Sequence, residues 1–173
     1  MSRGPVPAPG GQGGEHPSGS DASRAGGAGL SVEDGAKAVV RRYVDAFNRG
    51  DLAALKELLH EDAEIQGVLG RGRIQWVEPV WRQLIEGYGM RLRLRGLIAE
   101  GNLVAALYTE TGTFRAPAFG QAPTGRSYEL VAMEWFEIED GRIRRRWGAR
   151  DAAAQARQLG LAPPDHGMDA GAG

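Results

Sequence analysis

Three charged residues in the last third of the chain, Glu134, Arg145 and Asp151, have the residue types needed for proton transfer. A carboxylate that loses solvation binds its proton more tightly and can then exchange it near neutral pH. On the wall of an apolar cavity, the two carboxylates would act as general acid and base, with Arg145 beside them. The sequence therefore predicts a candidate acid–base site, provided that the three side chains face one cavity.

A predicted β-hairpin places the three residues on a common face. Two β-like segments, 128–138 and 143–151, flank Asp140-Gly141, a dipeptide that favours a two-residue hairpin turn. With an unbroken register, Glu134 lies opposite Trp147. One face of the ribbon then carries a mainly apolar set: Leu130, Ala132, Glu134, Phe136, Ile138, Ile143, Arg145, Trp147, Ala149 and Asp151.

Simpler explanations exist for charges on such a face. A slip of one residue in the register would turn all three side chains to solvent. A structural ion pair between Glu134 and Arg145 would also account for two of them. Asp151 directly precedes Ala152-Ala153-Ala154-Gln155 and is a good N-cap for a final helix. The residues alone leave these alternatives open.

Helical patterns come first in the chain. Ser31-Val32-Glu33-Asp34 is a capping-box pattern, and Gly50 is expected to end the helix that follows it. Asp51 is expected to cap a second, short helix, and a third is expected to begin near Pro79, because proline suits a first helical turn. The first helix has an apolar stripe at helical spacing: Ala36, Val39, Val40, Tyr43, Val44 and Phe47.

The pattern then changes to that of β-strands. Met90, Leu92 and Leu94 alternate with arginines, which is typical of a half-buried strand. A turn at Gly101-Asn102 leads into a β-rich run over 103–115, and a short helix is expected around 152–159. The order of elements predicts an α+β fold, in which a curved sheet is covered by helices on one face.

The composition bounds the domain. The chain has 173 residues, 42% hydrophobic and 25% charged, which is ordinary for one globular domain. Residues 1–30 and 163–173 are rich in small residues and proline without apolar periodicity, so we expect unfolded tails around a domain of residues 31–162. No apolar run is long enough for a signal peptide or a membrane span, so we expect a cytoplasmic protein without membrane contacts.

Several kinds of chemistry are not expected from these residues. There is no cysteine, and of three histidines only His60 falls within the expected domain, so we predict no metal site. No nucleotide loop, nucleophile elbow or dinucleotide fingerprint is present, so we predict no cofactor. A formal charge of −1 gives no general attraction to nucleic acid. The site is expected to use carboxylates, arginine, tyrosine and positioned water.

The other face of the predicted hairpin is apolar as well. Val131, Met133 and Trp135 alternate along it. An exposed apolar face of this kind predicts a homodimer that forms through the sheet.

Seven short motifs along the chain carry a resemblance to a known protein family. They are Tyr43-Val-Asp-Ala-Phe-Asn-Arg-Gly-Asp51, Ala99-Glu-Gly-Asn-Leu-Val104, Thr111-Gly-Thr113, Pro123-Thr-Gly-Arg126, Glu139-Asp-Gly-Arg-Ile143, Trp147-Gly-Ala-Arg-Asp151 and Gln158-Leu-Gly160. With these motifs the chain resembles, from about residue 35 to 162, the SnoaL-like polyketide cyclases (ester cyclases) of the NTF2-like superfamily.

The resemblance implies a cone-shaped α+β barrel, with a curved, mostly antiparallel sheet and about three helices around one pocket. It implies that Asp151 is the general acid/base of an intramolecular aldol condensation that closes a polyketide ring without metal or cofactor. Trp147 would shape an aromatic slot, and Tyr43 and Gln66 would contact the small-molecule substrate. Phe47, on the same stripe as Tyr43, is a further candidate contact or a core residue.

One departure from the family widens the functional expectation. The family cyclases have a histidine on the strand before the hairpin turn, and 128–138 contains none. Glu134 is the nearest ionisable replacement, and a Glu134–Asp151 pair would share a proton. Two alternatives stay open: water addition to an epoxide, with Arg145 orienting a carboxylate, and a non-catalytic, dimeric ligand-binding module.

Overall fold

The computed structural model of the chain describes residues 31–68 and 70–162. The two expected tails, 1–30 and 163–173, lie outside the described residues. The elements in chain order are α1 (Val32–Arg49), α2 (Leu52–Glu57), β1 (Leu59–Gly67), β2 (Gly70–Gly72), α3 (Ile74–Arg82), the π-helical turn η1 (Gln83–Gly87), β3 (Arg91–Glu100), β4 (Leu103–Thr113), β5 (Ser127–Glu139), β6 (Arg142–Arg150) and α4 (Ala152–Leu159).

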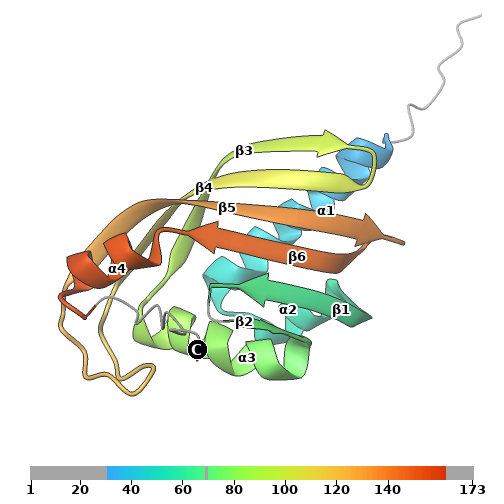
Figure 1. Cartoon of the computed structure of the whole chain (residues 1–173). Coiled ribbons are helices and arrows are strands. Elements are labelled where there is room, and N and C mark those ends of the chain that lie inside the picture. The colour runs from blue at the N-terminus through green and yellow to red at the C-terminus, as the bar shows by residue number, and fades with distance from the viewer. Residues whose placement is uncertain (1–30, 69, 163–173) are drawn as a thin grey trace, which may run out of the picture.

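The strands form one six-stranded sheet in the order β2-β1-β6-β5-β4-β3. All neighbouring strands are antiparallel except β1 and β6, which run parallel. The sheet curves, with α1 lying along one of its faces and α3 beside the β2 end, while α4 follows β6 (Figure 1). The expected α+β fold, with a curved, mostly antiparallel sheet, is confirmed.

Local signals set the ends of α1 as expected. The Ser31 side chain accepts a hydrogen bond from the backbone N–H of Asp34, and Gly50 ends the helix with a φ of 70°. A left-handed residue here is easiest for glycine, because it has no Cβ. The whole predicted stripe of α1 is buried in the core, including Tyr43 and Phe47.

Two boundaries differ from expectation. The helix α3 begins at Ile74 and contains Pro79 in its interior, so the prediction that Pro79 lies at the start of a helix was wrong. Tertiary packing overrides the local preference, since Trp81 on α3 is buried in the core. The strand β1 begins at Leu59, one residue after α2 ends, whereas the sequence favours a short extended segment only from Ala63 to Gly67.

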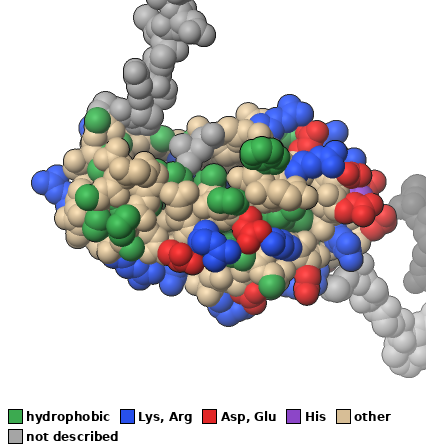
Figure 2. Space-filling view, turned by 90° about the horizontal axis from the view of Figure 1, so that it is seen from below, with side chains coloured by type: hydrophobic (Ala, Val, Ile, Leu, Met, Phe, Trp, Pro, Cys, Tyr) green, Lys and Arg blue, Asp and Glu red, His purple; other side chains and the backbone are tan. Residues whose placement is uncertain are grey.

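The outer face of α3 carries paired charges. Glu78 forms ion pairs with Lys56 at 2.5 Å and with Arg82 at 3.1 Å. Arg82 also pairs with Glu86 at 3.5 Å. Figure 2, seen from below α3, shows acidic and basic side chains interleaved with hydrophobic ones on this side of the molecule. This polar side leaves the apolar side of α3 to face the interior.

The β5–β6 hairpin turns where predicted but has an irregular register. Asp140 and Gly141 both have positive φ, 47° and 72°, and Ile138 pairs with Ile143. The next pair is Glu137 with Arg145, so Arg144 is an extra residue that forms a β-bulge.

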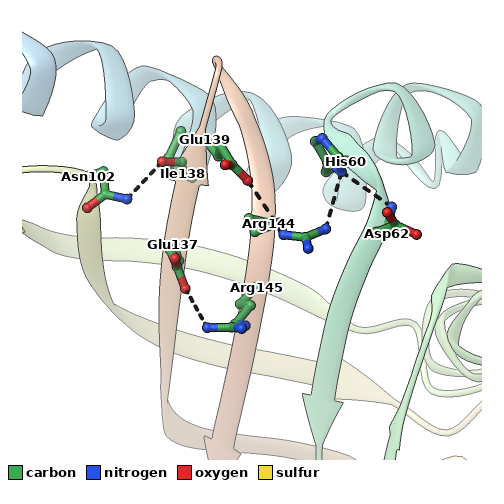
Figure 3. Close-up of polar contacts among 8 residues, drawn as sticks. All are labelled: His60, Asp62, Asn102, Glu137, Ile138, Glu139, Arg144 and Arg145. Atoms are coloured by element: carbon green, nitrogen blue, oxygen red, sulfur yellow. Dashed lines mark hydrogen bonds and ion pairs between the residues drawn. The ribbon is translucent and has the colours of Figure 1, made fainter.

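The bulge reverses the faces of β6. Figure 3 shows Arg144 extending toward His60 of β1, whereas Arg145 extends toward Glu137 of β5. Beyond the bulge, Arg146 is buried and Trp147 is exposed. Because side chains alternate along a strand, a single extra residue exchanges the inward and outward sets.

No helix among residues 31–68 and 70–162 is long and apolar enough to cross a membrane.

Candidate active site

A cavity of about 190 Å³ lies between the sheet and α3. Most of its wall is apolar, with Phe47 from α1, Ile65 from β1 and Trp81 from α3. The remaining apolar lining residues are Val68, Trp76, Val77, Val80, Leu84, Met90 and Leu92. An apolar pocket with a few charged groups is the usual form of a small-molecule site.

The charged residues of the cavity wall are Glu134, Arg146 and Arg150, together with the exposed Arg71 of β2. Glu134 and Arg146 are each only 5% exposed and form an ion pair with each other. The second carboxylate oxygen of Glu134, Oε2, and Nε of Arg146 have no hydrogen-bond partner among the described residues. An acceptor and a donor are thus left over on a cavity wall, where an unpaired polar atom is costly.

Gly148 leaves room for the Arg146 guanidinium, and Gly67 lies at an ordinary contact distance from it. A Cβ atom added at Gly148 would lie 2.9 Å from Nη2 of Arg146, and one at Gly67 would lie 3.7 Å from Nη1. Contacts of 2.9 Å to a carbon are closer than packing allows, so Gly148 must lack a side chain for Arg146 to lie where it does.

A second buried carboxylate, Glu110, lies behind Arg150. Glu110 is fully buried, and its Oε1 accepts hydrogen bonds from the hydroxyl of Tyr128 at 3.0 Å and from the side-chain amide of Gln155 at 3.3 Å. Its Oε2 lies 3.3 Å from Nε of Arg150. Burial raises the pKa of Glu110, and the opposing effects of Arg150 and the Tyr128 hydrogen bond are smaller.

Two further tyrosines are buried near these charges. Tyr43 and Tyr108 are fully buried, and their hydroxyls have no hydrogen-bond partner within the part of the chain that the structure describes. Burial raises the pKa of both phenols, so both are neutral donors across the physiological pH range.

Three of the sequence-predicted site residues lie in the interior, between the curved sheet and the helices that cover it. Glu134 and Phe47 line the cavity, and Tyr43 is buried, with the charges of Arg146 and Glu134 both acting on its phenol. The structure therefore brings together one predicted carboxylate and the two predicted residues of α1.

Asp151 does not face the cavity, so the expectation that it lies there is wrong. Its side chain is exposed, and its Oδ1 accepts a hydrogen bond from the backbone N–H of Ala154 at 2.7 Å. It is the N-cap of α4, which was the simpler explanation considered for it. The expected Glu134–Asp151 pair is not formed.

Arg145, Trp147 and Gln66 also lie on the outer face of the sheet, contrary to expectation. Arg145 pairs with Glu137 at 3.2 Å, so the alternative of a Glu134–Arg145 pair is wrong as well. Trp147 is 38% exposed and lies opposite Gln66 of β1, which is exposed. The bulge explains why Arg145 and Trp147 face outward. On β1, Ile65 turns inward, so its neighbour Gln66 faces outward.

Three charged residues near the cavity, Glu110, Arg146 and Arg150, were not predicted from the sequence. Glu110 had a readable signal, since it shares the alternation of the buried Ala106 and Tyr108 on β4. The arginines had none, because their facing depends on the bulge. Among the described residues no group of histidine, cysteine or acidic side chains could hold a metal ion.

The arrangement can move a proton and stabilise negative charge. The free oxygen of Glu134 can accept a proton, and the two guanidinium groups can stabilise an anion that forms next to it.

Comparison with known proteins places the chain in a family. The SnoaL-like domain family matches residues 40–146, more than half of the chain. No curated protein matches the chain in sequence.

Solved structures share the fold. IdmH, a candidate polyketide cyclase from Streptomyces antibioticus, has 26% identity and a TM-score of 0.64, covering 73% of this chain and 99% of its own. A candidate polyketide cyclase (xcc0381) from Xanthomonas campestris pv. campestris has 26% identity and a TM-score of 0.69, covering 75% and 99%.

A third structure shows the fold alone. It is an epoxide hydrolase of the LEH-like type from M. tuberculosis, with 18% identity, a TM-score of 0.60 and coverage of 73% of this chain and 90% of its own. The curved sheet and these structural likenesses show that the chain has the NTF2-like fold, and the match over residues 40–146 shows that it belongs to the SnoaL-like family.

Proposed function

We propose that this protein is a cofactor-free acid–base enzyme that closes a polyketide-type ring by intramolecular aldol condensation. The observation that carries the proposal is the unpartnered, buried Oε2 of Glu134, a residue that lines a mainly apolar cavity together with Arg146 and Arg150. The likeness to candidate polyketide cyclases at 26% identity supports a carbonyl-rich, hydrophobic substrate.

Glu134 supplies the proton transfer in this proposal. Its carboxylate takes the proton from a carbon between two carbonyl groups, and the C–H electrons form the enolate. The enolate carbon then forms a bond to a second carbonyl carbon, whose π electrons move to oxygen as an alkoxide. Glu134 returns the proton to that alkoxide, so the reaction neither gains nor loses a proton.

Arg146 and Arg150 stabilise the anion that forms. Arg146 is fixed by its ion pair with Glu134, and Arg150 by its contact with Glu110. Fixed positive charges on a mainly apolar cavity wall lower the energy of a developing enolate more than they do in bulk solvent.

Asp151 has no step in this proposal. Its carboxylate caps α4 outside the cavity. The proton transfer that the family resemblance implies for Asp151 is therefore assigned to Glu134.

The Glu134→Gln variant tests the proposal. It keeps the shape of the side chain but cannot accept a proton, so kcat on linear poly-β-ketone esters should fall by about 10²–10⁴-fold. The matched control is Glu137→Gln, an acidic residue on the same strand that faces outward. Equal turnover in Glu134→Gln and wild type would contradict the proposal.

Absence of turnover on every carbonyl and epoxide substrate, with ligand binding intact, would favour the non-catalytic binding module instead.

Water addition to an epoxide is the second candidate. It is favoured by a second buried carboxyl group, Glu110, which lies 3.3 Å from Arg150 and whose pKa burial raises, while Glu134 can activate water. Diol formation from terpene or styrene epoxides, lost in both Glu134→Gln and Glu110→Gln, would select this candidate. In the aldol reaction only Glu134 transfers a proton, so Glu110→Gln should reduce aldol turnover far less than Glu134→Gln does.

We also propose that two copies associate through the outer face of the sheet. The apolar residues Val131, Met133 and Trp135 of β5 are 63%, 57% and 46% exposed. Leu107 of β4 lies opposite Met133, and Trp147 of β6 lies opposite Trp135, so the apolar surface continues across three strands. Such a continuous surface suits a twofold interface. The expected cytoplasmic location stays a prediction.

A further inference from the structure

The side chain of Trp76 has an unusual position for so large an apolar group. It is 79% exposed, the most exposed large hydrophobic side chain among the described residues. It nevertheless lines the cavity, next to Val77 on the first turns of α3. An exposed indole at the edge of an enclosed cavity is a place where a ligand can cover apolar surface.

The strand β2 holds this indole at the rim. A Cβ atom added at Gly72 would lie 3.0 Å from Cβ of Trp76 and 3.5 Å from Cγ, so the Trp76 side chain lies directly over the backbone of β2. The nearby Arg71 pairs with Glu64 at 3.1 Å, which neutralises its charge at the rim. The rim therefore presents a positioned aromatic ring beside compensated charges.

The sheet register connects the rim to the polar wall. Gly72 pairs with Ile65 on β1, and Ile65 pairs with Arg146 on β6. Two strand spacings separate Gly72 from Arg146, which is about 10 Å. A planar molecule that contacts Arg146 or Glu134 can thus extend across the cavity toward Trp76.

The cavity volume limits the size of a ligand that fits inside it. The cavity, with Trp76 and Gly72 in its wall, holds about 190 Å³. An apolar cavity of about 150 Å³ takes one benzene molecule, so this cavity has room for about one substituted six-membered ring. A ligand with two or three fused rings must therefore extend out of the cavity, over the exposed indole of Trp76.

We propose that Trp76 and the segment Gly70–Gly72 form a rim subsite for the neutral, planar, apolar part of a multi-ring ligand. The polar ring of that ligand contacts Glu134 and Arg146 inside the cavity. This proposal rests on the proposed function for the direction in which the ligand lies, but it concerns binding alone and does not need turnover.

A series of neutral aromatic alcohols tests the subsite. Phenol, 2-naphthol and 2-anthrol carry the same hydroxyl on one, two and three rings, and their Kd values are measured by equilibrium dialysis. In the wild type, affinity should rise with each ring. In Trp76→Ala, the Kd of phenol should stay within twofold, while that of 2-anthrol should rise about 10-fold. Trp76→Phe should restore most of the lost affinity.

A second variant and a matched control separate local from general effects. Gly72→Ala should weaken only the larger alcohols, because its Cβ displaces the indole of Trp76. Trp135→Ala removes an exposed indole from the outer face of the sheet and should leave all three Kd values unchanged. The ring dependence should persist in Glu134→Gln, so failure of the proposed reaction is distinguishable from failure of the subsite.

Four results would overturn the subsite. They are an equal loss of phenol and 2-anthrol affinity in Trp76→Ala, the same loss in Trp135→Ala, no gain with ring number in the wild type, and no binding of any alcohol. A change of oligomeric state in Trp76→Ala with unchanged Kd values would also overturn it, since the rim would then be an interface between proteins.

Discussion

The guanidinium of Arg146 pairs with the carboxylate of Glu134 although the two residues do not lie opposite each other in the β5–β6 ladder. Arg146 lies opposite Phe136, and Glu134 lies opposite Gly148. The pair is therefore diagonal, and it crosses the position where Gly148 has no side chain. This relationship places an ion pair with one free carboxylate oxygen on the wall of the cavity.

Gly148→Ala tests whether the glycine is needed for this diagonal pair. The new Cβ would lie 2.9 Å from Nη2 of Arg146, so we expect the guanidinium to move and the protein to lose about 1–3 kcal/mol of stability. The turnover proposed for Glu134 should fall about 10- to 100-fold, because the pair loses its geometry. Urea unfolding and steady-state kinetics measure the two effects.

Gly96→Ala is the control for that substitution. Gly96 lies within β3, and a Cβ there meets nothing within 4 Å. Alanine in an extended segment is favoured over glycine by about 0.5–1 kcal/mol. Equal stability and equal turnover in Gly148→Ala and Gly96→Ala would show that Arg146 does not depend on the glycine.

Asp151 should behave as a helix cap. Asp151→Ala removes the acceptor for the backbone N–H of Ala154 and should cost about 1 kcal/mol of unfolding free energy. Asp151→Asn should leave both the stability and kcat close to wild type, because asparagine caps equally well. A collapse of kcat in Asp151→Asn at unchanged stability would return the catalytic role to Asp151.

Glu110 should make stability fall as pH rises. Burial raises the pKa of Glu110 in the folded protein, so between the unfolded value of about 4.3 and the folded value the native state binds the extra proton. Its contribution is complete below the unfolded pKa and is lost as pH rises through the folded pKa. Arg150, Tyr128 and Gln155 are the polar groups that contact it.

Glu110→Gln removes this titration. The unfolding free energy of the wild type minus that of Glu110→Gln should decrease from pH 5 to pH 8, measured by urea unfolding. A difference that stays constant or increases with pH would mean that the ion pair with Arg150 outweighs burial.

Met133→Glu should separate the proposed dimer. Met133 is 57% exposed at the middle of the apolar surface of β5, and two buried carboxylates at a twofold interface are costly. Sedimentation should show the wild type as a dimer and the variant as a monomer. Val32→Glu, on α1 and 71% exposed, is the control and should stay dimeric. A monomeric wild type at all concentrations would refute the dimer.

Local chemistry made much of the fold predictable. The Ser31 cap, the left-handed Gly50 and the Asp140-Gly141 turn act within a few residues of themselves, so each could be read from the chain. The facing of Glu134 was also predictable, because the alternation of β5 is unbroken from Tyr128 to Ile138. Pro79 shows the limit, since core packing of α3 outweighed its local preference.

The sequence by itself determined the α+β order of elements, the hairpin turn and the inward direction of Glu134. Only the tertiary structure decided which residues of β6 face the cavity. The N–H of Ile143 donates to the carbonyl oxygen of Leu58 at 2.8 Å, and Arg144 bulges toward His60. Since β1 comes from a distant part of the chain, the pairing that shifts β6 by one residue has no local signal. That shift turns Arg146 inward and Arg145 outward.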